Sequence, residues 1–417
     1  MMVLHISHSD REGGAAIAAR RLVAAQRGIG IDAQMLVLRK SGPEDWVHRY
    51  GGGAVRARIR TSRALFKRAC ALMASDEPKS MRSLAIMGGG LAHAALNMRP
   101  DAVHLHWLGA ECASLRDMRI DHVPTVWTCH DEWVFCGAEH YGTSGDYQTA
   151  YAKRSLLDPD RWTARRKLRQ WRGWRPTLIA PSCWMAARAA VSPITHDWPA
   201  CIIPNTLPFG SFALRSRTDA RGALGLDRDG HFILCGAVGG GKDPRKGFDL
   251  LAQAMQRLSE ATARKTTLIS FGGAEGDATI HGIRHLALGP VHETARLAAI
   301  YNAANVFVLP SRQDNLPNTL LEAQACGTPC VAFDVGGVGD AVLSPSCLIA
   351  AFDIAAMADA IDRQLTSLAS DRSRQSLRTA AIESFGEETV ATRHEALYRE
   401  VIDASRQQDD VQCMRRS

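Results

Sequence analysis

Two carboxylates, Asp314 and Glu322, stand in a pattern that could bind a sugar nucleotide. Asp314 lies in the polar loop 311–317, and Glu322 follows after seven intervening residues, in the first turns of a predicted helix. The start of a helix offers free N–H groups and the positive end of its dipole, which suit a phosphate. A carboxylate one turn further along can accept hydrogen bonds from a ribose diol. The residue types and their spacing therefore favour a site for a sugar nucleotide.

A strand–helix–strand unit has to position these acids. The apolar run 306–309 is typical of a buried parallel strand, and a second such run spans 330–333. Between the two strands, Asn318 is expected to cap a helix over 319–326. Ligands of such units bind at the carboxyl ends of the strands. Asn318 and Thr319, at the start of the helix, are therefore predicted to bind the sugar nucleotide together with the two acids.

The whole string 311–337, SRQDNLPNTLLEAQACGTPCVAFDVGG, resembles the donor-site signature of the family-four retaining glycosyltransferases. Among these it is most similar to enzymes of bacterial exopolysaccharide and colanic-acid-type assembly. The resemblance implies an α/β GT-B fold, in which two Rossmann-like, doubly wound domains face a cleft. It places Asp314 against the donor sugar and Glu322 at the ribose. The chain departs from the family at Asp314, where Glu is usual, and at Pro317, where Gly is frequent.

A basic loop, GGGKDPRKG at 239–247, follows a predicted strand over 232–237. It resembles the family's loop that carries an Arg and a Lys for the donor diphosphate. Lys246 matches the Lys, whereas the usual Arg is absent. Either Lys242 or Arg245 replaces it under this interpretation, and the residues do not decide between them. The alternative is a solvated basic loop without a ligand.

The first half of the chain offers a glycine pair and a histidine. Gly13 and Gly14 separate a predicted first strand from a helix, and such a pair lets a backbone approach a ligand. The resemblance implies that this loop faces the donor diphosphate and the acceptor. His130 ends a predicted strand over 123–129, in a string that resembles the HD-x-W of exopolysaccharide enzymes. The resemblance places His130 near the transferred sugar, although an isolated histidine is more often structural.

The domain boundaries follow from a linker and a final helix. The Ile-Pro-Asn string at 203–205 resembles the family's segment before the interdomain linker. We expect an acceptor-side domain over 1–205 and a nucleotide-sugar donor domain over 206–385. A helix over 386–406 is expected to pack back on the N-terminal domain, as in GT-B enzymes. The tail 407–417 is polar and is predicted to be disordered.

Two basic stretches carry weaker signals. The segment 54–73 has an amphipathic pattern with arginines, which is typical either of a helix on an anionic membrane or of an ordinary helix with a solvated basic face. The segment 161–175 interleaves arginines with tryptophans. Because no nucleic-acid module surrounds it, we expect a helix packed by its tryptophans, with its arginines toward solvent or an anionic acceptor, and no nucleic-acid partner.

Composition narrows the class of protein. The chain has 417 residues, 46% of them hydrophobic and 22% charged, which fits a globular protein of two or three domains. Its start has no signal-peptide pattern, and its eleven cysteines form no CxxC pair, so a reducing cytoplasm is expected. The formal net charge of +7 modestly favours anionic partners.

The resemblance implies retaining transfer of a sugar from a nucleotide-diphosphate sugar to a hydroxyl group. The acceptor expected from the resemblance is a lipid-linked saccharide at the inner face of the cytoplasmic membrane. Lys246 and the helix start can stabilise the departing diphosphate, so neither a metal nor another cofactor is expected. The alternatives are a non-catalytic sugar-nucleotide-binding protein and a GT-B epimerase or phosphorylase. The residues leave the donor's base and sugar, the acceptor, the linkage and the oligomeric state open.

Overall fold

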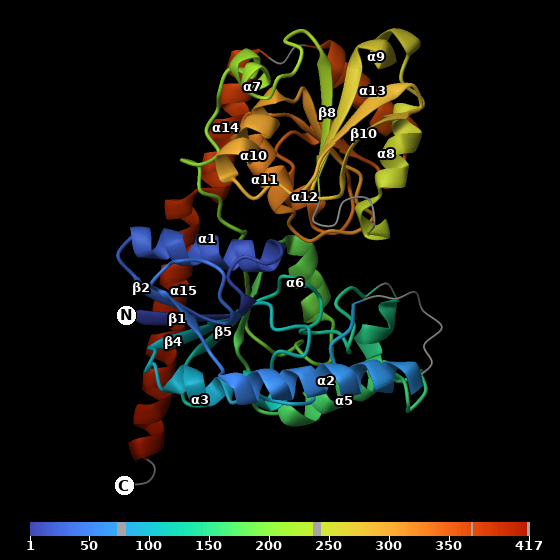
Figure 1. Cartoon of the computed structure of the whole chain (residues 1–417). Coiled ribbons are helices and arrows are strands. Elements are labelled where there is room, and N and C mark those ends of the chain that lie inside the picture. Colours follow the sequence, from blue (N-terminus) through green and yellow to red (C-terminus); the bar gives the residue numbers. More distant parts are fainter. Residues whose placement is uncertain (73–80, 143, 237–242, 368–369, 415–417) are drawn as a thin grey trace. The chain divides into compact units, whose positions relative to one another are not determined.

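The computed structural model describes residues 1–72, 81–142, 144–236, 243–367 and 370–414 (Figure 1). The chain divides into two compact units. Unit 1 comprises Met1–Pro204 and Val390–Ser417, and unit 2 comprises Asn205–Thr389. The predicted boundary near Thr206 lies beside this division. Each unit is an α/β structure built on a seven-stranded sheet, as the resemblance implied.

The sheet of unit 1 is parallel throughout, with the strand order β3-β2-β1-β4-β5-β6-β7. Its strands are β1 Met2–Ser9, β2 Asp32–Arg39, β3 Val47–Arg49, β4 Ala102–Leu105, β5 Thr125–Thr128, β6 Thr177–Ala180 and β7 Ala200–Ile202. The chain moves from β1 outward to β3 and then returns to the other side of β1. The switch point of the sheet therefore lies between β1 and β4, where ligands of such sheets bind.

Helices cover both faces of this sheet. They are α1 Gly14–Gly28, α2 Gly53–Leu72, α3 Leu91–Leu96, α4 Leu115–Met118, α5 Pro159–Gln170, α6 Cys183–Ala190 and α15 Glu387–Met414, with the short 3-10 helix η1 Gly145–Thr149. On β1, Leu4 and Ile6 belong to the core on one face, whereas Val3 belongs to the other. That second core also contains Tyr398 of α15, which Figure 1 shows crossing the sheet.

The sheet of unit 2 has the strand order β10-β11-β9-β8-β12-β13-β14, and it is parallel except that β10 pairs antiparallel with β11. Its strands are β8 His231–Gly236, β9 Thr266–Phe271, β10 Glu275–Ile280, β11 Ile283–Leu288, β12 Val306–Leu309, β13 Cys330–Phe333 and β14 Leu348–Ile349. The switch point lies between β8 and β12, because the chain adds β9 on one side of β8 and then β12 on the other.

The helices of unit 2 again lie on both faces of the sheet. They are α7 Arg217–Ala223, α8 Phe248–Met255, α9 Glu260–Lys265, α10 Thr294–Ala303, α11 Asn318–Ala325, α12 Val338–Ala341, α13 Ile354–Thr366 and α14 Asp371–Phe385, with the 3-10 helices η3 Pro244–Lys246 and η4 Pro345–Cys347. One core lies under α10, α11 and α14, and a second under α8 and α13. The central strands β8, β12 and β13 are almost completely buried, because helices cover both of their faces.

Several predicted helices have other bounds in the structure. The helix expected over 319–326 spans Asn318–Ala325. After the basic loop, α8 ends at Met255, and a separate helix, α9, begins after Ser259, whose hydroxyl accepts from the N–H of Thr262 at 3.2 Å. The last helix continues to Met414, well into the tail that was expected to be disordered. Helix α14 and the β10–β11 hairpin were not predicted.

The two basic stretches are partly buried against unit 1. On α2, Ile59 is only 4% exposed and Arg63 donates from Nε to the carbonyl of Ala110 at 2.9 Å. On α5, Lys167 is fully buried and donates to the carbonyls of Cys136 and Gly137 at 3.1 and 2.9 Å. The expectation that the arginines of this segment face solvent is wrong for Arg166, which is 8% exposed and donates from Nη2 to the Ala85 carbonyl at 2.9 Å. None of the described helices is long and apolar enough to span a membrane.

Candidate functional site

The loops that follow β8 and β12 meet at the switch point of unit 2. Lys246 ends the first loop and Asp314 lies in the second, and Lys246 Nζ is 2.7 Å from Asp314 Oδ2. The two side chains are 23% and 16% exposed, so both are accessible without being free in solvent. This pair joins two residues that the sequence predicted separately as site residues, and it spans the position where sheets of this kind bind ligands.

The loop that carries Lys246 is fixed against the end of β12. Asp243 caps η3 by accepting from the N–H of Arg245 at 3.0 Å. Gly247 has a φ of 63°, and a Cβ at this position would lie 1.9 Å from the carbonyl oxygen of Pro310. Both the left-handed backbone and the close approach require glycine here. Lys246 therefore reaches Asp314 from a backbone that has little freedom to move.

The loop that carries Asp314 is fixed from its other side by the turn after β13. A Cβ on Gly336 would lie 2.1 Å from the carbonyl oxygen of Asp314, and the N–H of Gly337 donates to the same oxygen at 2.9 Å. The positive φ of 60° and the close approach explain the glycine at position 336. The carbonyl of Asp314 is therefore held by the turn that contains Gly336 and Gly337.

The structure separates the two candidates for the missing arginine. Arg245 is committed within its own loop, because its Nη2 is 2.7 Å from Asp243 Oδ2. Lys242 lies outside the described residues. Arg312, which the sequence analysis did not select, bridges the two loops: its N–H donates to the Arg245 carbonyl at 2.7 Å and its Nη2 pairs with Asp249 Oδ2 at 2.6 Å. The sequence feature that could have identified Arg312 is its position in the loop 311–317, which was predicted to contribute to the site.

Helix α11 begins at Asn318, one residue earlier than predicted, so Asn318 is not the N-cap. Pro317 occupies that position and forms no side-chain cap. The Asn318 side chain accepts instead from Asn205 Nδ2 at 3.2 Å. Thr319 is half-buried in the first turn. The prediction that Asn318 caps this helix is therefore wrong, because Asn318 already has its place in the helical turn.

Glu322 lies one turn into α11 and is 5% exposed. Its Oε2 accepts a hydrogen bond from the hydroxyl of Tyr301, on α10, at 2.8 Å. A buried carboxylate of this kind needs hydrogen-bond donors. Tyr301 supplies one and orients the carboxylate, whose oxygens are acceptors of the kind that ribose hydroxyls can donate to.

A cavity of about 130 Å³ adjoins Lys246 at the carboxyl edge of unit 2. Its lining includes the rings of Phe248, Phe271 and His285, and the hydroxyl of Ser270. Ser270 Oγ and His285 Nε2 are 2.7 Å apart. Apolar walls with a few polar groups are typical of small-molecule sites. Sequence analysis missed these residues because they come from β9, β11 and α8, which only the fold brings together.

In unit 1, His130 follows β5 at the carboxyl edge of the sheet and is half-buried. Its Nε2 is 2.9 Å from Nδ1 of His106, which follows β4. Burial lowers the pKa of His130 to about 4, so the ring is neutral at neutral pH. The adjacent Asp131 accepts from Trp107 Nε1 and from His140 Nδ1, each at 2.6 Å. His106 thus contacts His130, which the resemblance places near the transferred sugar, directly.

Gly13 and Gly14 lie at the start of α1, after β1. Gly13 is the N-cap residue with a φ of 91°, and Gly14 is the first residue of the helix. No heavy atom would lie within 4 Å of a Cβ on Gly13, so the backbone conformation and not crowding requires glycine there. Ser9 Oγ accepts from the N–H groups of Arg11 and Glu12 at 3.2 and 3.1 Å and orders the preceding turn.

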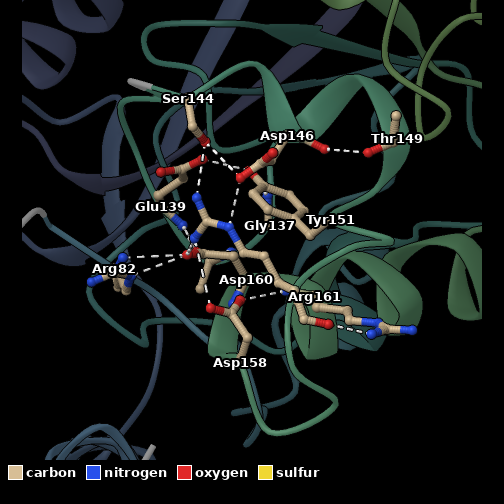
Figure 2. Close-up of polar contacts among 12 residues, drawn as sticks. Arg82, Gly137, Glu139, Ser144, Asp146, Thr149, Tyr151, Asp158, Asp160 and Arg161 are labelled. Atoms are coloured by element: carbon tan, nitrogen blue, oxygen red, sulfur yellow. Dashed lines mark hydrogen bonds and ion pairs between the residues drawn. The ribbon is translucent and has the colours of Figure 1, made fainter. Parts of the chain in front are cut away.

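A cluster of buried polar side chains lies in the long segment between β5 and β6 (Figure 2). Asp160 is fully buried, and its Oδ1 accepts from the N–H groups of Ala138 and Glu139 at 3.1 and 2.9 Å. Its Oδ2 pairs with Arg82 and Arg154 at 3.3 and 3.2 Å. These contacts connect the segment between β5 and β6 to the rest of unit 1.

Solved structures with the same fold define the class of protein. The sucrose-phosphate synthase from Thermosynechococcus elongatus aligns with a TM-score of 0.67 and 20% identity, over 97% of this chain and all of that one. The Anabaena protein Alr3699/HepE, in complex with UDP and glucose, aligns with a TM-score of 0.63 and 14% identity, over 96% of this chain and 100% of that one. Two parallel-sheet, Rossmann-like units arranged along the chain in this way are the GT-B glycosyltransferase fold.

Within that class, residues 233–367 match the family described as glycosyl transferases group 1. Curated relatives point the same way: the D-inositol 3-phosphate glycosyltransferase of Frankia alni is 37% identical over 166 residues, which are 35% of this chain and 39% of the relative. The Xylanimonas cellulosilytica enzyme of that name is 39% identical over 139 residues, or 31% and 32% of the two chains. The matches thus span less than half of these relatives. Residues 233–367, which lie in unit 2, are therefore similar to group 1 glycosyltransferases.

Proposed function

We propose that the protein transfers a sugar from a nucleotide-diphosphate sugar to a hydroxyl group, with retention of the anomeric configuration. The observation that carries this proposal is the Lys246–Asp314 pair, held at 2.7 Å across the switch point of unit 2. Both residues lie inside the segment that matches the group 1 family. At this edge, the cation can bind the diphosphate of the donor while the acid binds its sugar.

Lys246 is assigned to the diphosphate. Negative charge grows on the leaving diphosphate in the transition state, and a fixed cation stabilises it. The N–H groups at the start of α11 add a partial positive charge, although Pro317 contributes none. In the absence of donor, Asp314 holds Lys246, and a bound phosphate would compete for the same ammonium group. We propose that the reaction needs no metal and no other cofactor.

Glu322 is assigned to the ribose, with its carboxylate already oriented by Tyr301. The cavity beside Lys246 is assigned to the base, because Phe248 and His285 offer ring surfaces and Ser270 offers a hydroxyl. Asp227 and Asp229, a pair of acids that could attract a cation, precede β8 and are exposed at its amino-terminal edge. They therefore lie at the opposite end of the strand from this site.

The acceptor that we propose is a lipid-linked saccharide that is used in cell-surface or exopolysaccharide assembly. It rests on the string around His130, which resembles enzymes of that kind. A polyol phosphate is a second candidate, because the matching relatives are named D-inositol 3-phosphate glycosyltransferases. The exposed arginines of α2 support a peripheral place at the inner face of the cytoplasmic membrane through charge, with Ile59 buried in the unit.

The test begins with donor binding. Thermal unfolding is measured with UDP-, GDP-, ADP- and dTDP-sugars, since a bound ligand stabilises the fold by mass action. The stabilising donor is then incubated with lipid-linked saccharides and with inositol phosphate, with and without EDTA. Product NMR reads the anomeric configuration.

A retained product that forms equally in EDTA supports the proposal. Donor binding without transfer to any acceptor would instead favour a non-catalytic binding protein, and a changed donor sugar without transfer would favour an epimerase. Dependence on Mg²⁺ or Mn²⁺ would overturn the metal-independent assignment.

A further inference from the structure

A chain of side-chain hydrogen bonds leads from His130 into the interior of unit 1. His130 Nε2 lies 2.9 Å from His106 Nδ1, His106 Nε2 lies 2.9 Å from His5 Nδ1, and His5 Nε2 lies 2.8 Å from Gln26 Oε1. We call Gln26, His5, His106 and His130 the histidine relay. His5, His106 and Gln26 are all buried, and the relay passes from β5 through β4 and β1 to α1.

The rings of the relay are neutral. Burial lowers the pKa of His5 to about 3 and holds the pKa of His106 well below its ordinary value. The pKa of His130 is lowered to about 4 by the same cause. A neutral imidazole has one N–H group and one lone pair. Each hydrogen bond in the relay therefore fixes the proton positions of the ring on either side of it.

The direction of the relay follows from Gln26. Its Oε1 can only accept, so His5 Nε2 carries a proton and His5 Nδ1 is an acceptor. His106 Nε2 must then donate to His5. His106 Nδ1 is left as an acceptor, and His130 Nε2 donates to it. The ring of His130 is thereby held with its proton on Nε2 and its lone pair on Nδ1.

A second branch starts from the amide nitrogen of Gln26. Gln26 Nε2 donates to the hydroxyl of Tyr398 on α15 at 2.9 Å. With the amide in this orientation, Tyr398 donates to His104 Nδ1 at 2.7 Å, and His104 Nε2 donates to Thr128 Oγ1 at 2.7 Å. Both hydroxyls can donate or accept, so turning the amide over would reverse the proton order of both branches. The orientation of the Gln26 amide thus decides which nitrogen of His130 carries the proton.

We propose that Gln26, His5 and His106 are positioning residues that hold His130 as its Nε2–H tautomer, in which Nδ1 is the acceptor nitrogen of the ring. Any effect of that nitrogen on a substrate hydroxyl rests on the proposed function, whereas the tautomer itself does not. Thr128 lies on the other branch, and its loss leaves every bond of the relay in place.

The same region suggests a rival interpretation. His5, His104 and His106 have ring nitrogens within 4.8 Å of one another, which is close enough for a metal ion. However, both nitrogens of each ring already have a hydrogen-bond partner, and these partners are uncharged imidazoles, an amide and two hydroxyls. A buried dication among neutral groups is costly, because its charge has no counter-charge there. The relay and its second branch together account for every one of these nitrogens.

The experiment observes His130 directly. Imidazole ¹⁵N NMR of the full chain at neutral pH distinguishes the protonated from the unprotonated ring nitrogen, and His130→Gln assigns the signals. We expect the Nε2–H tautomer in the parent. In His5→Leu and in Gln26→Leu, neither of which removes the ring that contacts His130, we expect a mixture of tautomers. Thr128→Val, the matched control, should leave the parent spectrum of His130.

Turnover gives the second measurement. If His130 contacts a substrate hydroxyl, His5→Leu and Gln26→Leu should lower kcat by about tenfold while donor KM stays near the parent value, and Thr128→Val should change neither. The proposal is overturned if the parent holds the Nδ1–H tautomer, if both relay variants keep the Nε2–H tautomer, or if the purified protein retains one equivalent of metal on these histidines. Loss of the tautomer without any change in kcat would refute the substrate contact at Nδ1. A protein without transferase activity would still show the tautomer, so the two failures are distinguishable.

Discussion

Lys246 is a partly exposed residue on a rigid loop, so its charge can be removed with little effect on the fold. A partly exposed ion pair contributes roughly 0–1 kcal/mol to stability. A cation that stabilises the leaving diphosphate contributes much more to the reaction, and losing one such group lowers turnover by about 10²–10³-fold. We therefore expect Lys246→Ala to unfold near the parent temperature and to lose about that much kcat.

The matched control for this prediction is Arg264→Ala, because Arg264 pairs with Glu260 at 3.0 Å in the same unit on an exposed helix. It should keep parent turnover. Steady-state kinetics and thermal unfolding of both variants provide the measurement. Equal turnover in Lys246→Ala and the parent would remove Lys246 from the site.

Glu322 should govern the binding of nucleoside diphosphate. Hydrogen bonds to a charged group contribute roughly 1.5–3 kcal/mol each, so losing one or two should weaken binding by about tenfold to several thousandfold in Glu322→Ala. Glu322→Gln keeps one acceptor and should lose less. Tyr301→Phe removes only the hydroxyl that orients the carboxylate and should lose least. Calorimetric titration with the nucleoside diphosphate measures all three.

Asp314 provides the contrast, because it is assigned to the donor sugar. Asp314→Asn should lower turnover while the affinity for the free nucleoside diphosphate stays within about threefold of the parent, a shift of roughly 0.6 kcal/mol. The division of roles is wrong if Asp314→Asn and Glu322→Ala weaken that affinity equally. Glu322→Ala also leaves the buried Tyr301 hydroxyl without its acceptor, at a cost of about 1–3 kcal/mol, so titrations belong well below its unfolding temperature.

Single residues of the candidate site could be predicted from sequence, but their contacts could not. Lys246 and Asp314 stood in recognisable strings, yet their ion pair joins positions that are far apart in the chain. The bridging role of Arg312 and the cavity residues depend on strands and helices that only folding brings together. Asn318 shows the limit of local rules: it has the residue type of an N-cap, but Pro317 takes that position.

At the scale of elements, the layer between the sheet of unit 1 and helices α1 and α15 contains several neutral histidines. Burial lowers the pKa of His5 to about 3 and of His394 to about 4, and it holds that of His104 well below the ordinary value. The unfolded chain binds protons below about pH 6.5, whereas the folded protein does so only near pH 3–4. Stability should therefore fall as the pH decreases through this window.

The magnitude follows from proton uptake. Each such histidine contributes a slope of about 1.4 kcal/mol per pH unit over its window, because the unfolded state binds one proton more. Urea midpoints between pH 7 and pH 4.5 measure the sum. His394→Leu should reduce the slope by about one proton. A flat profile between pH 6.5 and 5 would mean that these rings are charged in the folded protein.

Helix α2 offers a different test, of charge at a surface. Arg56, Arg58 and Arg60 are exposed, whereas Arg63 is held by Ala110. If α2 lies near anionic lipid, each exposed arginine contributes about 1 kcal/mol, and the triple change to Glu should release the protein from anionic vesicles. Reversal of Arg257 and Arg264, exposed in unit 2, is the control. Sedimentation with vesicles measures binding, and a parent that does not sediment refutes membrane contact by α2.

Elements with a strong local signal were predicted well, and elements without one were not. The apolar runs became β1, β8, β12 and β13, because a strand covered on both faces needs apolar residues throughout. The hairpin of β10 and β11 has few buried residues and therefore no clear hydrophobic pattern. Helix α14 is polar along most of its length and gave no such pattern either.

At the scale of the whole molecule, the sequence predicted two sheets of the same class and a last helix that returns to the first unit. Periodicity alone could not show that return, and the resemblance supplied it. The structure gives the physical reason: Val390, Tyr398 and Ile402 of α15 are buried with Val3 in one core of unit 1. Unit 1 is therefore complete only when its last helix, which follows unit 2 in the sequence, packs into this core.

This dependence leads to a prediction about truncation. Ending the chain after Gly386 keeps α14 and the contact of Phe385 with Leu207, whose N–H donates to the Phe385 carbonyl at 3.0 Å. It removes Val390, Tyr398 and Ile402 from unit 1. Burying such side chains contributes roughly 1.5–3 kcal/mol each, so unit 1 should lose on the order of 5 kcal/mol, a large fraction of the stability of a domain.

Scanning calorimetry of the parent and the truncated chain measures the effect. We expect the transition of unit 1 to move down by ten degrees or more, on the order of 2–4 °C per kcal/mol, or to disappear, while that of unit 2 stays in place. A chain ending at Gln407 is the control, because it retains all three buried side chains and should match the parent. If truncation after Gly386 leaves both transitions unchanged, α15 does not stabilise unit 1. If only the transition temperature of unit 2 falls, α15 stabilises unit 2 and not unit 1, and the prediction is wrong.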